Sequence, residues 1–161
     1  VHGCRAVLPQ LRQSPDPVLV NLSSIFAMVS VPTQSIYNAS KAAVRAFSDG
    51  LREELRSSGI DVLCVHPGGI KTNIANNARI TDVSMVADSD QEMRDNFTKL
   101  AQTTPQQAAA VILQAIVSRK TRALIGADAK LMDGLFRLFP TRSSQWLSAL
   151  GQWMRMRAKP V

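Results

Sequence analysis

The sequence predicts an α/β fold: the C-terminal portion of a Rossmann-like doubly wound parallel sheet, with about three strands and flanking helices. Three short runs of apolar, β-branched residues are separated by longer segments with helical periodicity, and this alternation is typical of parallel sheets. The runs are apolar almost throughout, as expected for buried strands. A chain of 161 residues with 45% hydrophobic content can bury one such core.

The first half of the chain predicts a strand–helix–strand unit. Residues 1–12 are typical of the end of a helix, which we expect to close at Pro9 before a polar loop. Residues 17–23 predict a buried strand, and residues 61–66 predict the next one, joined to it by a right-handed crossover. Between them, residues 35–58 predict a long helix ended by Gly59. Its apolar side chains recur at helical spacing: Ile36, Ala39, Ala43, Phe47, Leu51 and Leu55.

The second half of the chain predicts an irregular excursion followed by a second helix and strand. Residues 72–100 are polar and weakly periodic, which indicates one or two short helices in a mobile segment. Thr104 and Pro105 are typical of a helix start, and residues 121–125 predict the third strand. Amphipathic stretches follow at about 128–139 and 143–157. We expect the helix that starts at Thr104-Pro105 to run to about Ser118. Its predicted inner face consists of Ala108, Val111, Ile112, Ala115 and Ile116.

Composition excludes several classes of function. The net charge is +7, but +5 of it comes from basic residues after Asp133, where there is no acid, and aromatic content is only 5%. We therefore expect no nucleic-acid partner. Cys4 and Cys64 lack the spacing of a metal site or disulfide framework, so we expect two core thiols, no metal, and a cytoplasmic protein. No apolar run reaches the roughly 18 residues of a membrane-spanning helix.

Tyr37 and Lys41 are the first candidates for chemistry. They stand four residues apart at the start of the long predicted helix, so they share one face about 6 Å apart. A phenol is a weak acid with a pKa of about 10. A neighbouring ammonium group and the positive end of the helix dipole both favour the phenolate. The pair therefore predicts a proton donor and acceptor that works near neutral pH.

Two further motifs follow predicted strands. Ser24 comes directly after the first strand, where open parallel sheets bind ligands and a hydroxyl can hold a reacting oxygen. Pro67, Gly68, Gly69 and Ile70, with Thr72, follow the second strand, and we expect the glycines to let the backbone approach a cofactor. We interpret His66 and His2 as structural residues, since each lies outside any metal-binding pattern.

Taken in order, Asn21-Leu-Ser-Ser24, Tyr37-Asn-Ala-Ser-Lys41 and Pro67-Gly-Gly-Ile-Lys-Thr72 resemble the successive motifs of the short-chain dehydrogenase/reductase family. The resemblance covers roughly residues 1–126. It implies an oxidoreductase that transfers a hydride between NAD or NADP and an alcohol or carbonyl substrate. It makes Tyr37 the acid–base residue, Ser24 the residue that orients the substrate oxygen, and Lys41 the residue that favours the phenolate and binds the nicotinamide ribose.

The resemblance also implies the parts around these residues. The backbone of 67–70 and the Thr72 side chain would hold the nicotinamide end of the cofactor, and 72–100 would be the variable substrate-binding excursion. The family's glycine-rich phosphate loop precedes the positions seen here, and the sequence contains no such segment. We therefore expect the chain to be the C-terminal portion of a longer enzyme and incomplete by itself. The alternative is a truncated relative that acts only as a folding or oligomerisation unit.

The resemblance and the C-terminal sequence also indicate what the protein binds. We expect a homo-oligomer that binds a small-molecule substrate. Residues 127–161 form a basic amphipathic extension, in which Trp146 and Trp153 lie among apolar and basic residues. One interpretation is a helix that packs on its own domain or on another subunit. The other is a peripheral contact with an anionic membrane surface, which would make the protein membrane-associated.

Overall fold

The computed structural model describes residues 1–78, 87, 89–143, 145–146 and 148–149. Its centre is a parallel sheet of three strands in the order β1-β2-β3: β1 (Val18–Leu22), β2 (Asp61–Pro67) and β3 (Arg122–Ile125). Val18 lies opposite Asp61 in the first pair, and Cys64 lies opposite Arg122 in the second. The structure confirms the predicted α/β class and all three predicted strands.

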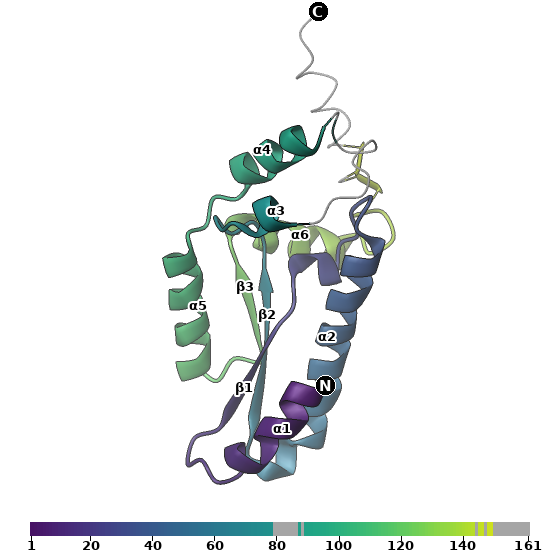
Figure 1. Cartoon of the computed structure of the whole chain (residues 1–161). Coiled ribbons are helices and arrows are strands. Elements are labelled where there is room, and N and C mark those ends of the chain that lie inside the picture. Colours follow the sequence, from purple (N-terminus) through teal and green to yellow (C-terminus); the bar gives the residue numbers. More distant parts are fainter. Residues whose placement is uncertain (79–86, 88, 144, 147, 150–161) are drawn as a thin grey trace, which may run out of the picture.

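Helices cover both faces of this sheet (Figure 1). On one face lie α1 (His2–Leu11), α2 (Ser35–Glu54) and α6 (Ala127–Leu138), and on the other lies α5 (Pro105–Val117). Two short helices, α3 (Ile74–Asn77) and α4 (Asp90–Leu100), lie beyond the carboxyl ends of the strands. Single 3₁₀ turns, η1 (Ile25–Ala27) and η2 (Arg56–Ser58), follow β1 and α2.

The two crossovers have opposite hands. The strands are added in sequence order, yet α2 and α5 cover opposite faces of the sheet. The β1–α2–β2 connection is right-handed, as predicted from the strong preference of such units. The β2–α5–β3 connection is therefore the rare left-handed kind. Because Pro67 at the end of β2 lies opposite Ile125 at the end of β3, the start of α6 lies beside the end of β2.

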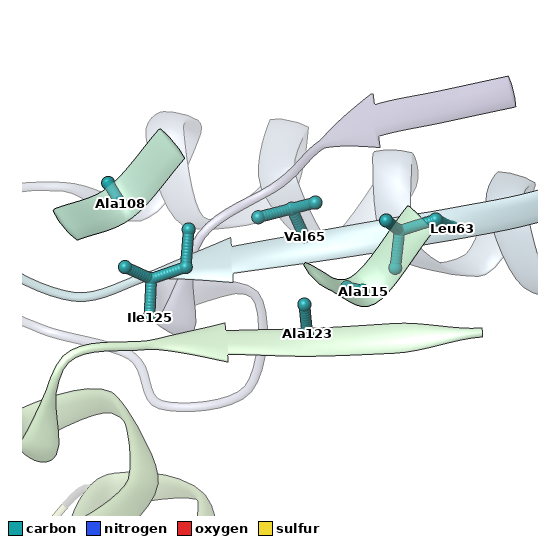
Figure 2. Packing of buried hydrophobic residues seen from close by; sticks show 6 residues of the cluster. All are labelled: Leu63, Val65, Ala108, Ala115, Ala123 and Ile125. Carbon is teal, nitrogen blue, oxygen red and sulfur yellow. The ribbon is translucent and has the colours of Figure 1, made fainter. Parts of the chain in front are cut away.

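Alternation along β2 divides the core into two layers. Leu63 and Val65 pack against α5, whereas Val62 packs with Leu51 and Leu55 of α2. Figure 2 shows the first layer, in which small alanines let helix and sheet approach closely. The side chains in this layer are Leu63, Val65, Ala108, Ala115, Ala123 and Ile125. A third cluster, of Ile25, Met28, Val29 and Ala129, joins η1 to α6.

Polar contacts connect α1 and α2 across β1. The Cys4 thiol lies 3.3 Å from Asn21 Oδ1, and the Asn21 amide donates to Ser48 Oγ at 3.0 Å. Cys64 is buried and, like Cys4, is a free thiol. Burial raises the pKa of the Cys64 thiol. The expectation of two unpaired thiols agrees with this arrangement, although Cys4 is only half-buried.

Several sequence-based details are wrong. Pro9 does not close the first helix but lies inside it, and α2 ends at Glu54, before the predicted 58. Ile36 is 86% exposed and Val111 is also exposed, although both fit the apolar spacing of their helices. Helical periodicity identifies a stripe of apolar residues, but the packing partner decides which part of that stripe is covered.

The excursion and the C-terminal stretches agree with expectation where they are described. Ser89 is the N-cap of α4, and its hydroxyl accepts from the Glu92 backbone N–H. With α3, the segment therefore contains two short helices. The predicted stretch at 128–139 is α6, whereas most of 143–157 lies outside the described residues. Among the described helices, none has the length and apolar character needed to cross a membrane.

Candidate active site

The candidate residues gather at the carboxyl ends of β1 and β2. Leu22 of β1 lies opposite Val65 of β2, so the residues that follow each strand emerge at the same edge of the sheet. Ser24 follows β1, and Pro67 ends β2. α2 begins at Ser35, after a loop that Asn38 anchors by donating to the Val31 carbonyl at 3.2 Å. This edge is where open parallel sheets bind ligands.

Tyr37 and Lys41 lie together in the first two turns of α2. Lys41 Nζ is 5.6 Å from the centroid of the Tyr37 ring, and the tyrosine is 38% exposed, so its phenol is accessible. The Phe26 ring packs edge-on against the Tyr37 ring, with centroids 6.4 Å apart and planes at 83°. The predicted juxtaposition of phenol and ammonium is therefore present.

Lys41 also connects α2 to the end of β1. Its ammonium group donates to the Leu22 carbonyl at 3.3 Å, and its own carbonyl accepts from Ser23 Oγ at 2.8 Å. An ammonium group has three hydrogens to donate. One is directed to Leu22, so two remain for other acceptors.

Ser24 is 7% exposed and lies at the start of η1. Its hydroxyl accepts from the Phe26 backbone N–H at 3.1 Å. A hydroxyl that accepts one hydrogen bond still has its own hydrogen to donate. Phe26 therefore touches both halves of the site, through its backbone at Ser24 and through its ring at Tyr37.

The glycines of the loop after β2 lie close to a carboxylate from α6. The Gly68 N–H donates to the Ile125 carbonyl at 2.9 Å, and the Gly69 N–H donates to Asp128 Oδ2 at 2.6 Å. A Cβ atom on Gly68 would lie 2.1 Å from the same Asp128 oxygen. A Cβ on Gly69 would lie 2.9 Å from the Ala101 Cα atom. The glycines thus permit close contact with the protein's own groups.

The rest of this loop is joined to the segment before α5. Ile70 pairs with Thr103 as an isolated parallel bridge, and the Lys71 N–H donates to the Thr103 carbonyl at 2.9 Å. Thr72 is exposed, and its hydroxyl accepts from the Ile74 N–H at 3.4 Å, at the start of α3. Pro67 to Ile70 are half-buried, so the loop is partly accessible along its length.

Two further residues hold this edge together, and only one of them was singled out from the sequence. Asp128 is one, since its carboxylate fixes the Gly69 N–H. His66 is the other: it is fully buried, and its Nδ1 lies 3.2 Å from the Ser24 carbonyl oxygen. This contact agrees with the interpretation of His66 as a hydrogen-bonded residue. In the sequence, Asp128 is an acidic residue in the first turn of a helix that follows Gly126. Because acidic residues are common at this position in helices, this feature did not indicate a contact with Gly69.

The arrangement can bind and protonate an oxygen. The Ser24 hydroxyl and the Tyr37 phenol are both O–H donors, and Lys41 supplies a positive charge beside the phenol. The two remaining Lys41 hydrogens and the exposed Thr72 hydroxyl are further polar groups at this edge of the sheet. Within the described part of the chain, no group of three or more His, Cys, Asp or Glu side chains could hold a metal ion.

Comparison with known proteins gives consistent matches. Residues 1–83 match the sequence model of a family described as short chain dehydrogenase. Over 154 residues, the chain is 40% identical to "Putative oxidoreductase SadH" of Mycobacterium tuberculosis, covering 94% of this chain and 54% of that protein. The chain thus spans about half the length of this relative.

Solved structures show the same fold. A short-chain dehydrogenase from Burkholderia cenocepacia, in complex with NADP, superimposes with a TM-score of 0.67 at 23% identity, covering 97% of this chain and 53% of that one. A short-chain dehydrogenase/reductase from Burkholderia phymatum, in complex with NAD, gives a TM-score of 0.62 at 25% identity. That match covers 85% of this chain and 54% of the other.

Proposed function

Because this chain belongs to the short-chain dehydrogenase family, as its match over residues 1–83 shows, we propose that it supplies the catalytic residues of an NAD(P)-dependent oxidoreductase. The reaction is hydride transfer between the cofactor and an alcohol or carbonyl substrate. The observation that carries the proposal is the accessible Tyr37 phenol beside the Lys41 ammonium group, at the edge where Ser24 follows β1. The NAD complex of a 25% identical relative supports the choice of cofactor.

Each residue has a distinct role in this proposal. Tyr37 donates a proton to the substrate oxygen when a carbonyl is reduced, and accepts it when an alcohol is oxidised. Ser24 donates its free hydrogen to the same oxygen and fixes its position. Lys41 stabilises the phenolate that Tyr37 becomes, and donates its two remaining hydrogens to the nicotinamide ribose.

The bound nicotinamide would supply or accept the hydride itself. This chain's residues would hold its reactive end: the backbone of Pro67, Gly68, Gly69 and Ile70, together with the Thr72 hydroxyl. Hydrogen bonds to Ile125 and Asp128 already occupy the N–H groups of Gly68 and Gly69. They therefore serve to set the path of the loop, and contacts to the nicotinamide amide fall to Pro67, Ile70 and Thr72.

The division of the chain follows from these roles. Residues 1–126 form the C-terminal part of the dinucleotide-binding domain, with 72–100 as the substrate-binding excursion. The position of α3 and α4 beyond the carboxyl ends of the strands supports that assignment (Figure 1). Phosphate binding falls to a glycine-rich segment that these 161 residues do not contain, so the chain by itself is catalytically incomplete.

The proposal includes a cytoplasmic homo-oligomer. Ile36 at the start of α2 is 86% exposed, which leaves an apolar side chain for another part of the enzyme to cover. Residues 127–161 form the C-terminal extension, whose tail either packs on its own domain or another subunit, or contacts an anionic membrane surface. Vesicle co-sedimentation with and without residues 140–161 distinguishes the two, because only the membrane contact gives tail-dependent, salt-sensitive binding.

Tyr37→Phe tests the catalytic assignment in the whole enzyme. Loss of the phenolic hydrogen removes proton transfer but leaves the ring and its packing against Phe26 in place. We expect kcat to fall by about 10²–10⁴, the usual contribution of an acid–base group, while cofactor binding measured by NAD(P)H fluorescence persists. Lys41→Met should weaken both cofactor binding and kcat.

The result that contradicts the assignment is a Tyr37→Phe enzyme that keeps more than about a tenth of the wild-type kcat. If instead the whole wild-type protein transfers no hydride with a panel of alcohols and carbonyls, while its oligomer stays intact, the non-catalytic alternative holds.

A further inference from the structure

His66 is a completely buried side chain that the proposed reaction does not use. It is the last residue of β2 before Pro67, where the loop proposed to hold the nicotinamide begins. Its Nδ1 atom lies 3.2 Å from the carbonyl oxygen of Ser24, a residue 42 positions earlier in the chain. His66 therefore connects β2 to the residue proposed to orient the substrate oxygen.

The contact determines which nitrogen of His66 carries a hydrogen. Burial lowers the pKa of His66, although its hydrogen bond with the Ser24 carbonyl acts in the opposite direction. The ring is therefore neutral at neutral pH and has one N–H. Because a carbonyl oxygen only accepts, that hydrogen lies on Nδ1 and is donated to Ser24. The other tautomer would direct the Nδ1 lone pair at the carbonyl oxygen and leave a buried N–H at Nε2, which has no partner among the described residues.

The hydrogen bond from His66 joins the turn that begins at Ser24 to the sheet. The backbone just before this turn is held by β2, because the Ser23 N–H donates to a carbonyl of that strand at 2.8 Å. The other hydrogen bonds that the structure gives Ser24 stay within its own turn. Its carbonyl also accepts from the Ala27 N–H at 3.1 Å, and its hydroxyl accepts from the Phe26 N–H at 3.1 Å. Those two bonds would move with the turn if it rotated, whereas the bond from His66 resists rotation.

Apolar packing of the turn does not set its orientation in the same way. Ile25 and Met28 of this segment pack with Ala129 of α6, but apolar contacts are non-directional, whereas a hydrogen bond has a preferred angle. With the chain fixed before Ser24 and the following peptide fixed by His66, the Ser24 side chain points in one direction. Because His66 is 0% exposed, bulk water cannot replace this bond when it is lost.

We propose that His66 is the positioning residue of Ser24: its Nδ1–H holds the Ser24 carbonyl so that the Ser24 hydroxyl meets the substrate oxygen beside Tyr37. This inference rests on the proposed function, in which Ser24 donates to that oxygen. Because it is completely buried, His66 itself reaches neither substrate nor cofactor and acts only through Ser24. A misplacement of about 1 Å at a catalytic site can lower the rate by about 10²-fold. Loss of this bond should therefore lower kcat and leave cofactor binding unchanged.

Two variants of the whole enzyme separate positioning from packing. Asparagine and leucine both branch at Cγ and have similar shapes, but only asparagine has an N–H donor bonded to Cγ, as Nδ1 is in His66. His66→Leu should lower kcat by roughly 10–100-fold, and His66→Asn should restore most of it. The Kd of NAD(P)H, measured by fluorescence, should match the wild type in both variants. A role in packing alone predicts the opposite order, because a buried amide costs more than a buried leucine side chain.

Val62→Ala is the matched control for a buried change in β2. Val62 is 1% exposed and lies four residues before His66, so it is on the same face of the strand, but it packs with Leu51 and Leu55 rather than with Ser24. It should lower the urea midpoint and leave kcat unchanged. The proposal is overturned if His66→Asn is no more active than His66→Leu, if Val62→Ala lowers kcat as much, or if His66→Leu weakens cofactor binding as strongly as it lowers kcat.

Ser24→Ala distinguishes a failure of this inference from a failure of the proposed function. Removal of one positioned donor should lower kcat by about 10²–10³-fold, and His66→Leu should then cost little more, because the residue through which it acts has lost its hydroxyl. An equal loss from His66→Leu with and without the Ser24 hydroxyl refutes the positioning role alone. A Ser24→Ala enzyme with full kcat contradicts the proposed role of Ser24, and with it this inference.

NMR of the nitrogen-labelled wild-type enzyme keeps the proposal testable if the His66 variants do not fold. The chemical shifts of the two ring nitrogens show which of them carries a hydrogen. We expect the hydrogen on Nδ1 at neutral pH. A neutral ring with its hydrogen on Nε2 cannot donate to the Ser24 carbonyl and refutes the proposal.

Discussion

The carboxylate of Asp128 determines the conformation of the loop that follows β2, and this leads to a prediction about Gly68. Gly68 does not have a left-handed backbone, so alanine there meets no backbone strain. Its Cβ would instead lie 2.1–2.5 Å from three carboxyl atoms of Asp128. Because real Cβ atoms do not approach so closely, the Gly68→Ala substitution must displace the carboxylate from the Gly69 N–H.

The size of the effect follows from the bond that is broken. The Gly69 N–H donates to a charged, part-buried carboxylate at 2.6 Å, and such bonds stabilise proteins by about 1.5–3 kcal/mol. We expect Asp128→Ala and Gly68→Ala each to lower the free energy of unfolding by about this amount. In the Asp128→Ala background the obstacle is gone, so Gly68→Ala should cost much less, with a coupling of about 1–3 kcal/mol.

Urea unfolding of the two single variants, the double variant and the wild type measures this coupling. Gly69→Ala is the matched control, because its Cβ would meet the Ala101 backbone, which Asp128→Ala leaves in place. If Gly68→Ala costs the same free energy with and without the Asp128 carboxylate, the explanation of this loop is wrong.

Two further predictions concern stability. Thr104→Ala should lower the free energy of urea unfolding by about 0.5–2 kcal/mol. The substitution removes the capping box, in which Thr104 Oγ1 and the Gln107 side chain each accept from the other's backbone N–H. An unchanged urea midpoint would contradict this. The lowered pKa of His66 means that the folded state binds its proton less readily than the unfolded state. In chloride, the contribution of neutral His66 to the free energy of unfolding should therefore be fully present above about pH 6.5 and decline as the pH falls below that value. His66→Gln should flatten this decline. Unfolding that does not depend on pH between about pH 8 and 5 would exclude it.

Local sequence patterns predicted the elements well because each depends on neighbouring residues. The short, β-branched apolar run from Val62 to Val65, bounded by turn residues, predicts a buried strand. Thr104-Pro105 predicts a helix start through its own capping contacts. Tyr37 and Lys41 were placed together for the same reason, since a four-residue spacing on a helix fixes their separation. The roles proposed for Ser24 and the 67–72 loop still depend on the enzymatic tests.

Tertiary packing decided the features that involve distant residues. Ile36 and Val111 fit the apolar spacing of their helices, yet both are exposed, because burial depends on which segment packs opposite. The hydrogen bond between Asp128 and Gly69 joins residues 59 positions apart, and nothing near either residue in the chain indicates it. It exists because β2 and β3 pair in parallel with Pro67 opposite Ile125, which brings the start of α6 beside the end of β2.

The sequence by itself thus determined the strand and helix segments and the pair of residues on one helical face. The fold decided which glycines must stay glycines, and it buried His66 with its Nδ1 against the Ser24 carbonyl. The physical reason is the separation along the chain of the residues that interact. Helix periodicity and capping are set by residues within about four positions of each other, whereas a loop conformation or a buried charge depends on groups that meet only when the sheet is assembled.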